Sequence, residues 1–325
     1  MKADPRYRPA WHWMVILTLL AWLATGNNAM SAGETTRIVV ISDINGRYGS
    51  VAYHPRLSTA ISRIISLQPD IVISTGDMVA GQRPSPKLKR SELEAMWARF
   101  HRDIRTPLEQ AGIPVLMTPG NHDASAYPAY RLERQVYSEY HQAHPAAIEP
   151  AEGGNFPFHY QAQVGEISLI SLDATQPGAF PKPQLSWLSQ ALQPEKSTIV
   201  FGHLPLQPIA IGRERDVIRD AALEQLLAAH GNLTYLSGHH HAYYPGQRLG
   251  VTMLGMGNLG GNQRRLIGTS VRTGFSFALL EYDGGELLRL TAFVGPDFSQ
   301  PLDQSLLPAA IGSGVERLEL LQDFP

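Results

Sequence analysis

Short apolar and β-branched runs alternate with longer amphipathic stretches along most of the chain, a pattern typical of strands separated by crossover helices. The runs that predict strands are 37–42, 71–74, 114–118, 158–164, 166–172, 198–201, 233–237, 275–282 and 286–294. Apolar residues at helical spacing predict helices at 57–67, 91–110, 128–140, 184–192 and 216–230.

Turn and capping residues mark the ends of several of these elements. Gly165 separates two predicted strands so closely that we expect a hairpin, and Asp-Gly-Gly at 283–285 is a second hairpin signal. Ser91 and Glu94 form a predicted capping box at the start of the helix at 91–110. Because crossover units and hairpins both occur, we predict an α/β fold with two packed mixed sheets flanked by helices.

The first 32 residues have the composition of a targeting segment. A basic start is followed by an apolar run at 11–24 and then by small and polar residues. This run is shorter than the roughly 20 residues that a membrane-spanning helix needs, which favours cleavage, for example after Ser31, over retention as an inner-membrane anchor. We therefore predict a signal peptide or N-terminal anchor at 1–32, a single domain at 33–325, and an exported protein, periplasmic or secreted, with no membrane span after cleavage.

Composition narrows the possible functions. The formal net charge of −2 at pH 7 argues against a general nucleic-acid binder, which would carry a basic face. Two small basic clusters, 87–90 and Arg264 with Arg265, are interpreted as solvated surface. The chain contains no cysteine, which excludes disulfides, thiolate metal ligands and a cysteine nucleophile. Any metal ion must therefore be bound through oxygen and nitrogen.

Polar residues that can bind metal follow five of the predicted strands. The carboxyl ends of strands in α/β sheets form the crevice where ligands bind, and a glycine beside each ligand would let the backbone turn sharply. Each segment alone has an ordinary explanation as a cap, an Asx turn or an exposed histidine run, but their joint order favours one site. The segments are 42–46, 76–77, 120–123, 202–203 and 238–241.

These segments offer carboxylate, amide and imidazole groups, which suit divalent ions such as Mn, Fe, Zn or Co. A single tetrahedral ion cannot use them all. Two ions about 3.5–4 Å apart, bridged by a carboxylate, could do so, and such a pair stabilises both the attacking and the leaving oxygen of a phosphoryl displacement. The candidate ligands are Asp43, Asp77, Asn121, His203, His239 and His241. The histidines without companion ligands, which receive no site role, are His101, His141, His144, His159 and His230.

The order of these motifs resembles the calcineurin-like metallophosphoesterase superfamily, whose pattern is Asp-x-His, Gly-Asp, Gly-Asn-His-Asp/Glu, a later His and Gly-His-x-His. The resemblance covers residues 38–293. It implies a four-layer αββα sandwich, in which two central mixed β-sheets are flanked by helices, with a dinuclear metal site between the sheet ends. By the same resemblance, Asp77 would bridge the two ions, and Asp43 and His241 would hold the first. The ligands of the second ion would be Asn121, His203 and His239.

The first motif departs from the family pattern, because Asn45 stands where the family has a histidine ligand. An amide oxygen is a weaker and harder ligand than imidazole. Three alternatives follow: Asn45 binds the ion through its oxygen, Tyr48 or His54 replaces the missing ligand, or one ion alone is held tightly. Purple acid phosphatases, which also lack this histidine, use a tyrosine after Gly-Asp, where this chain has Val79 and Ala80.

The resemblance also implies a mechanism. A metal-bound hydroxide would attack phosphorus in line, and His122 would protonate the leaving oxygen as the general acid. Asp123 would orient or charge-couple that imidazole, and Asn121 would contact the phosphate. His240, between two ligands, would point away from the metals. The implied protein is a hydrolase of phosphomonoesters or phosphodiesters that depends on two divalent ions (Mn, Fe or Zn).

Substrate contacts are assigned from loop position alone. Arg47 and Tyr48 follow the first motif and are predicted to bind a small phosphorylated substrate, since an arginine can grip phosphate with two hydrogen bonds. The glycine-rich run at 255–261 is interpreted as a tight turn between strands rather than as backbone that reaches the site. Other residues placed at the rim are Gln82, Arg83, Asn258 and Asn262.

A metal-binding scaffold, or an inactive homologue that acts as a binding module, is the alternative function. The replacement of the family's histidine ligand by Asn45 lends weight to this alternative. His122 argues against it. This histidine binds no metal in the family scheme, so a pure binding module has no need for its imidazole.

Overall fold

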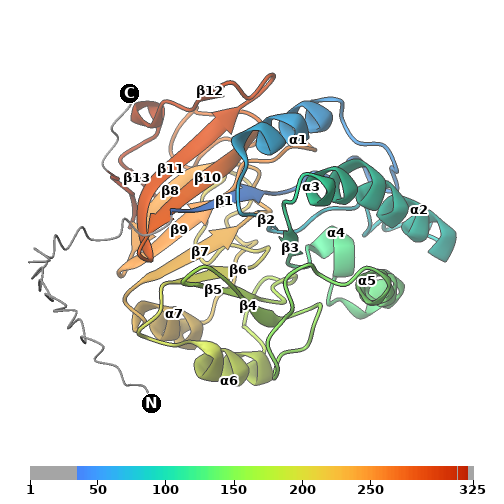
Figure 1. Cartoon of the computed structure of the whole chain (residues 1–325), viewed down its shortest axis with the longest axis horizontal. Coiled ribbons are helices and arrows are strands. Elements are labelled where there is room, and N and C mark those ends of the chain that lie inside the picture. Colours follow the sequence, from blue (N-terminus) through green and yellow to red (C-terminus); the bar gives the residue numbers. More distant parts are fainter. Residues whose placement is uncertain (1–34, 313, 321–325) are drawn as a thin grey trace, which may run out of the picture. The chain divides into compact units, whose positions relative to one another are not determined.

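Two β-sheets lie at the centre of the unit Gly33–Pro325 (Figure 1). The computed structural model describes residues 35–312 and 314–320, so the targeting segment predicted at 1–32 lies outside the described residues. Within the described ranges, no helix has both the length and the apolar character needed to cross a membrane.

The first sheet is six-stranded and mixed. Its strands, in spatial order, are β12 (Gln300–Pro301), β11 (Glu286–Val294), β10 (Ser276–Asp283), β1 (Thr36–Ile41), β2 (Ile71–Ser74) and β3 (Val115–Met117). Parallel pairing joins β1, β2 and β3, whereas β10 is antiparallel to both β1 and β11. The carboxyl ends of β1, β2 and β3 therefore meet at one edge of this sheet.

The second sheet is eight-stranded. Its strands, in spatial order, are β13 (Ala310–Ile311), β14 (Val315–Arg317), β8 (Tyr244–Arg248), β9 (Val251–Gly255), β7 (Leu233–Ser237), β6 (Thr198–Phe201), β5 (Ile167–Ser171) and β4 (Tyr160–Val164). Strands β5, β6, β7 and β9 run parallel, and β4 and β5 form the hairpin predicted at Gly165. Neither β8 nor β9 was predicted from the sequence pattern. In β8, Pro245 and Gly246 interrupt the alternation of apolar and polar residues that indicates a strand.

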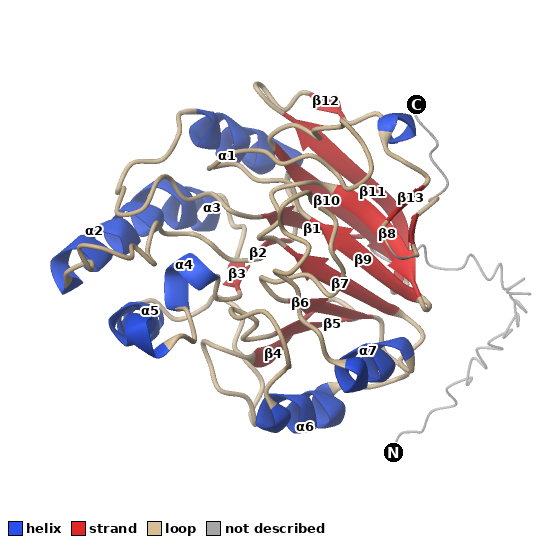
Figure 2. Cartoon of the chain, turned by 180° about the vertical axis from the view of Figure 1, so that it is seen from behind, coloured by secondary structure: helices blue, strands red, loops and turns tan. Residues whose placement is uncertain are grey.

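Helices cover the outer face of each sheet (Figure 2). Those on the side of the first sheet are α1 (Arg56–Leu67), α2 (Arg90–Phe100), α3 (Thr106–Gln110), α4 (Asn121–Ala124) and α5 (Arg131–Ala143). Those on the side of the second sheet are α6 (Lys182–Ala191) and α7 (Ala221–Ala228). The layers follow the predicted order of helices, sheet, sheet and helices, which confirms the αββα fold class.

Strand β1 shows why the sheets are buried on both faces. Val39 and Ile41 pack into the core beneath α1 and α2, whereas Ile38 and Val40 pack into the core between the two sheets. All four side chains are inaccessible to solvent. A strand buried on both faces reads as a continuous apolar run, as this segment does. A third core lies between the second sheet and α6 and α7.

The predicted capping box at the start of the helix at 91–110 is wrong. The helix begins at Arg90, and the Glu92 carboxylate accepts a 2.8 Å hydrogen bond from the backbone N–H of Lys89. The acidic residue that caps the helix therefore lies two positions before Glu94. The segment also contains a π-helical turn at His101–Arg105 between α2 and α3.

The helix predicted at 216–230 begins five residues later than expected. The Asp220 carboxylate accepts hydrogen bonds from the backbone N–H groups of Ala222 (3.0 Å) and Leu223 (3.1 Å), so Asp220 is the N-cap of α7. Residues before it are held in a loop, because Ile218 donates from its backbone to the carbonyl of Pro205. Asp216 is thereby freed from the helix.

His141, which received no site role from its sequence context, is buried among aromatic residues of α2 and α5. Its ring contacts the rings of Trp97, Tyr137, Tyr140 and Phe156, and its Nε2 has no hydrogen-bond partner among the described residues. Burial lowers the pKa of His141 to about 3. The imidazole is therefore neutral in the folded protein at pH values where the unfolded chain takes up a proton.

His141→Phe should make the protein more resistant to mild acid. As pH falls below about 6.5, only the unfolded state gains a proton at this residue, so the wild type loses up to about 1.4 kcal/mol of unfolding free energy per pH unit until about pH 3. The phenylalanine variant lacks this loss. Urea unfolding at pH 7.0 and 5.0 measures the difference, with His144→Gln at the end of α5 as control. Parallel pH dependence of wild type and His141→Phe would refute the assignment.

Candidate metal centre

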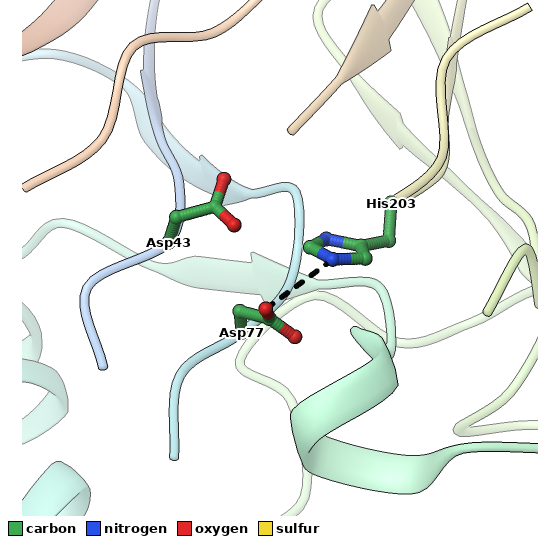
Figure 3. Close-up of side chains that lie close together, drawn as sticks. All are labelled: Asp43, Asp77 and His203. Carbon is green, nitrogen blue, oxygen red and sulfur yellow. Dashed lines mark ion pairs between the residues drawn. The ribbon is translucent and has the colours of Figure 1, made fainter. Parts of the chain in front are cut away.

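The five polar segments converge at the carboxyl ends of strands from both sheets. Asp43 follows β1, Asp77 follows β2 and His203 follows β6. One ligand atom from each of these three side chains lies within 4.8 Å of the others, and all three are buried (Figure 3). Asn121 after β3 and His239 after β7 reach the same place, since the Asn121 Oδ1 and His239 Nδ1 atoms lie 2.9 and 3.2 Å from His203 Nε2.

Four of the predicted ligands have left-handed backbone conformations. The φ angles are 49° at Asp43, 58° at Asp77, 64° at His239 and 49° at His241. This region is sparsely populated by residues other than glycine, although aspartate and histidine enter it more often than most. Such strain persists only where the surrounding structure enforces it, and it concentrates at functional sites. Here it turns each side chain inward directly after a strand.

Two glycines let the segments approach one another. A Cβ atom on Gly120 would lie 2.2 Å from Asp77 Oδ1, and one on Gly238 would lie 2.6 Å from Asp43 Oδ2. Neither clash can be relieved without moving a ligand. The expected role of small residues beside the ligands is therefore seen at both positions.

His203 lies at the centre of the cluster. Its Nδ1 donates to the carbonyl of Thr75 at 2.9 Å, so in the neutral ring Nε2 carries the lone pair. That nitrogen faces Asn121 Oδ1 and, at 3.4 Å, Asp77 Oδ2. Without a metal, burial disfavours the charged ring, but the Asp77 carboxylate outweighs it and raises the pKa of His203 to about 9. His203 and His122 hold the pKa of Asp77 well below its usual range despite burial.

His241 and Asp43 form the neighbouring part of the cluster. His241 Nδ1 donates to the carbonyl of Asn262 at 2.8 Å, which leaves Nε2 3.1 Å from Asp43 Oδ1. Among the described residues, this buried Oδ1 accepts no hydrogen bond of good geometry. Burial raises the pKa of Asp43, but His241 and His203 outweigh it, so the net shift is downward. An unsatisfied buried carboxylate oxygen of this kind fits a missing cation.

His239, like His203 and His241, has an oxygen atom beside its outer ring nitrogen. The oxygen belongs to Asp216, which the sequence did not indicate as a site residue. The Nε2 atom of His239 faces Asp216 Oδ2 at 3.8 Å, while its Nδ1 points into the cluster. Burial lowers the pKa of His239 to about 4, in opposition to the Asp216 carboxylate. All three histidines thus direct their outer nitrogen to an oxygen atom, an arrangement typical of metal-bound histidine. The inward nitrogens and the two carboxylates form a donor set that fits divalent ions.

Asn45 lines the cavity above the cluster. Its Nδ2 donates to the carbonyl of Val79 at 3.2 Å, which turns the amide so that Oδ1 is the atom left for an ion or a water molecule. Tyr48 and His54, the two proposed substitutes, line the same cavity. Ligation by Asn45 therefore stays a prediction, as do the other two alternatives.

His122 faces the cavity from the short helix α4. Its backbone N–H donates to Asp77 Oδ1 at 2.9 Å, and its ring Nδ1 lies 2.9 Å from the carbonyl oxygen of Gly81. Donation to Gly81 leaves Nε2 for proton exchange. Tyr48 stacks on the ring, with centroids 5.0 Å apart and planes inclined by 29°. His240, in contrast, is buried and directs its Nε2 to the backbone carbonyl of Asp216, away from the cluster as expected.

The prediction that Asp123 orients the His122 imidazole is wrong. The Asp123 carboxylate accepts hydrogen bonds from the backbone N–H groups of Asp77 (2.7 Å), Gly120 (2.8 Å) and Val79 (2.9 Å). Successive residues of a helical turn point about 100° apart, so neighbours in α4 face different directions. Asp123 therefore fixes the loop that carries Asp77.

A cavity of about 1160 Å³ lies above the cluster. Arg47, Tyr48, Gln82, Asn121 and Asn262 line it as predicted. Two predictions of residues at the rim are wrong. Arg83 forms an ion pair with Glu92. Asn258 is buried, and its side-chain amide donates a hydrogen bond to the carbonyl of Gly260. Charged lining residues that were not predicted from the sequence include Arg56, Arg213, Asp216 and Arg264.

Two sequence interpretations of this region change. The run at 255–261 is more than a turn, because Gly260 and Gly261 line the cavity. Arg264, interpreted as solvated surface, is half-buried there. None of these three residues belongs to a motif with ligand spacing. The sequence signal that could have placed them at the cavity was their position in the loop after β9.

Comparison with known proteins places this site in a family. The sequence model described as calcineurin-like phosphoesterase matches residues 36–243. The chain belongs to the calcineurin-like phosphoesterase family. No curated protein sequence matches this chain.

Solved structures share the fold at low sequence identity. A dimetal phosphatase from Danio rerio has 14% identity and a TM-score of 0.53, with 79% of this chain and 95% of that chain covered. A purple acid phosphatase from yellow lupin has 18% identity and a TM-score of 0.56, with 80% and 51% covered, so this chain spans about half of that protein. GAP50, described as the anchor in the inner membrane complex of Plasmodium, has 12% identity and a TM-score of 0.51, with 88% and 90% covered.

Asp216→Asn should weaken metal binding about 10- to 100-fold, the usual effect of removing a carboxylate behind a metal-binding histidine. Asparagine keeps the size of the side chain but loses the charge that holds the His239 tautomer. Calorimetric titration of the chelated protein with Mn or Zn measures the change. Glu214→Gln, an exposed neighbour in the same loop, is the control. Equal affinity of Asp216→Asn and wild type would show that Asp216 does not support His239.

Proposed function

We propose that this chain hydrolyses esters of phosphoric acid with the help of two divalent metal ions. The observation that carries the proposal is the convergence of inward-facing histidine nitrogens on two buried carboxylates beneath an open cavity. Membership of the calcineurin-like phosphoesterase family supports the same reaction class. Metal identity (Mn, Fe or Zn) and the choice between monoester and diester are part of what the experiment below determines.

The donor set would divide between two ions. Asp77, which has a carboxylate oxygen within 4.8 Å of ligand atoms of both Asp43 and His203, would bridge them. Asp43 and His241 would hold one ion, with Asn45 as a further oxygen donor. The other ion would be held by Asn121, His203 and His239. When bound, these ions would acidify a water molecule and offset negative charge on the phosphate.

The remaining site residues would bind and protonate the substrate. His122 would donate a proton from Nε2 to the leaving oxygen, because its Nδ1 is directed to Gly81. Asn121 is oriented by Gln82, whose Oε1 accepts its amide N–H at 2.6 Å, so that Oδ1 faces the metal ligands. Arg47 and Tyr48, at the exposed rim, would contact the rest of a small phosphorylated substrate.

Hydrolysis of nitrophenyl phosphate and bis-nitrophenyl phosphate tests the reaction. The protein is first treated with a chelator and then supplied with Mn, Zn or Fe. We expect release of nitrophenol only after metal is restored, and the preferred ester assigns the enzyme to monoesters or diesters. Stoichiometric metal binding without release from either ester would overturn the proposal.

A metal-binding scaffold is the second candidate, and the replacement of the family histidine by Asn45 favours it. Metal binding without turnover would support this function. Export of the mature chain is a separate proposal. Mass spectrometry of the mature N-terminus, with cleavage near Ser31 as the expected result, distinguishes an exported enzyme from an anchored one.

A further inference from the structure

The cavity is lined by an arginine, Arg264, whose guanidinium makes no direct ion pair with any described residue. The Arg264 guanidinium forms no hydrogen bond or ion pair in the ranges 35–312 and 314–320, and its Nε is buried. The backbone N–H of Arg264 donates to the carbonyl of His241 at 3.2 Å, which anchors the residue beside the predicted metal ligands. A buried donor without an acceptor is costly, and such groups in proteins normally have a partner.

Arg56 lines the same cavity. Its guanidinium carbon is 3.4 Å from the centroid of the Phe275 ring, and Nη1 donates to the carbonyls of Leu259 (3.3 Å) and Gly260 (3.4 Å). These contacts are all with neutral groups, so they fix the plane of the guanidinium without neutralising it. Because these contacts fix the guanidinium of Arg56, its remaining N–H donors are already oriented to bind an anion.

A single loop connects the two arginines. From Leu259, where Arg56 binds, the loop passes Gly261, where an added Cβ would lie 2.9 Å from the His241 ring, and reaches Arg264. Both cations are thus tied to the backbone that surrounds His241. Arg213 also lines the cavity, but Asp216 matches its charge at 2.6 Å.

Arg56 and Arg264 supply more positive charge than the binding of one phosphate group beside two metal ions requires. A scissile phosphate would lie against the metal ions, which already supply positive charge, so two further cations beside His241 have no partner in that role. The neutral contacts of Arg56 and the guanidinium of Arg264, which forms no ion pair within the described residues, suit an anion with oxygen atoms in a plane or a fork.

We infer that Arg56 and Arg264 form a second anion subsite, and that the substrate is a phosphate ester carrying another phosphate or carboxylate group near the scissile phosphate. The assignment of the scissile group rests on the proposed function. The subsite itself rests on the two arginines. A binding experiment can therefore separate the two.

Three inhibitors that cannot be hydrolysed distinguish the possible anions. Methylphosphonate carries one anionic group, phosphonoacetate adds a carboxylate, and methylenediphosphonate adds a second phosphonate. Calorimetric titration of the Mn-loaded protein should show at least 10-fold tighter binding of one of the last two, as expected for a charged hydrogen bond of about 1.5–3 kcal/mol. The probe that gains more affinity identifies the second group.

Arg264→Gln should abolish this preference while methylphosphonate affinity changes less than about 3-fold, which is below 1 kcal/mol. Arg265→Gln, an exposed neighbour, is the matched control, and Arg264→Lys should retain part of the preference because it keeps the charge. Equal affinity of the three probes for the wild type, or a preference that survives in Arg264→Gln, would overturn the subsite. An Arg264-dependent preference in a protein that hydrolyses no ester would instead overturn the proposed reaction and leave the subsite standing.

Discussion

Asp77→Asn should lower kcat/KM for phosphate ester hydrolysis by about 10³-fold or more, equivalent to about 4 kcal/mol of transition-state stabilisation. The substitution removes the negative charge that both proposed ions would share. It should therefore lower the affinity of the site for each of them. Asparagine is preferable to alanine because it tolerates the left-handed backbone at φ 58° and can still accept the hydrogen bond from the His122 backbone.

Steady-state kinetics at saturating Mn, together with calorimetric measurement of metal stoichiometry, tests the prediction for Asp77. Asp70→Asn is the matched control, since Asp70 lies beyond the opposite end of β2 and is exposed. Its activity should equal that of the wild type. Near-normal turnover by Asp77→Asn with both ions bound would exclude a bridging role for this carboxylate.

His122→Gln should separate substrates by their leaving groups. For an alkyl phosphate, whose leaving oxygen needs a proton, we expect kcat to fall about 10²- to 10⁴-fold, the usual contribution of a general acid. For nitrophenyl phosphate the loss should be much smaller, because nitrophenolate leaves without protonation. Glutamine can retain a hydrogen bond to Gly81, so the position of α4 should be preserved.

Metal binding provides the control for His122, since its ring is not among the proposed ligands. Titration of His122→Gln with Mn should give the wild-type stoichiometry and affinity. An equal loss of kcat for alkyl and nitrophenyl esters would contradict proton donation and indicate that the ring only positions the substrate.

The metal ligands could be predicted from the sequence because each lies directly after a parallel strand. Strands of this kind align their carboxyl ends, so local position along the chain determines position in space. The strands β5, β6 and β7 and the hairpin at Gly165 were predicted from equally local signals. Together these signals predicted the layers and the convergence of Asp43, Asp77 and His203.

Residues that act through tertiary contacts could not be predicted in this way. Asp216 lies in a segment with helical apolar spacing, yet bonds from Ile218 to Pro205 and from His240 to Asp216 hold it in a loop. Arg264 has no motif, and its place in the cavity depends on the path of the loop after β9. Asp123 adjoins His122 in sequence but turns away in α4. In each case the decisive contact joins segments far apart in the chain or depends on a helical turn too short to predict.

The convergence of loops from both sheets has a mechanical consequence. Asp43 and Asp77 extend from the first sheet, whereas His203, His239 and His241 extend from the second, so each of the two proposed ions would have ligands from both sheets and would cross-link them at one edge. The chain has no cysteine and thus no covalent cross-link between sulfur atoms. Metal binding would then act as a reversible cross-link. The binding event that completes the proposed site would also stabilise the contact between the two sheets and protect the protein from proteolysis.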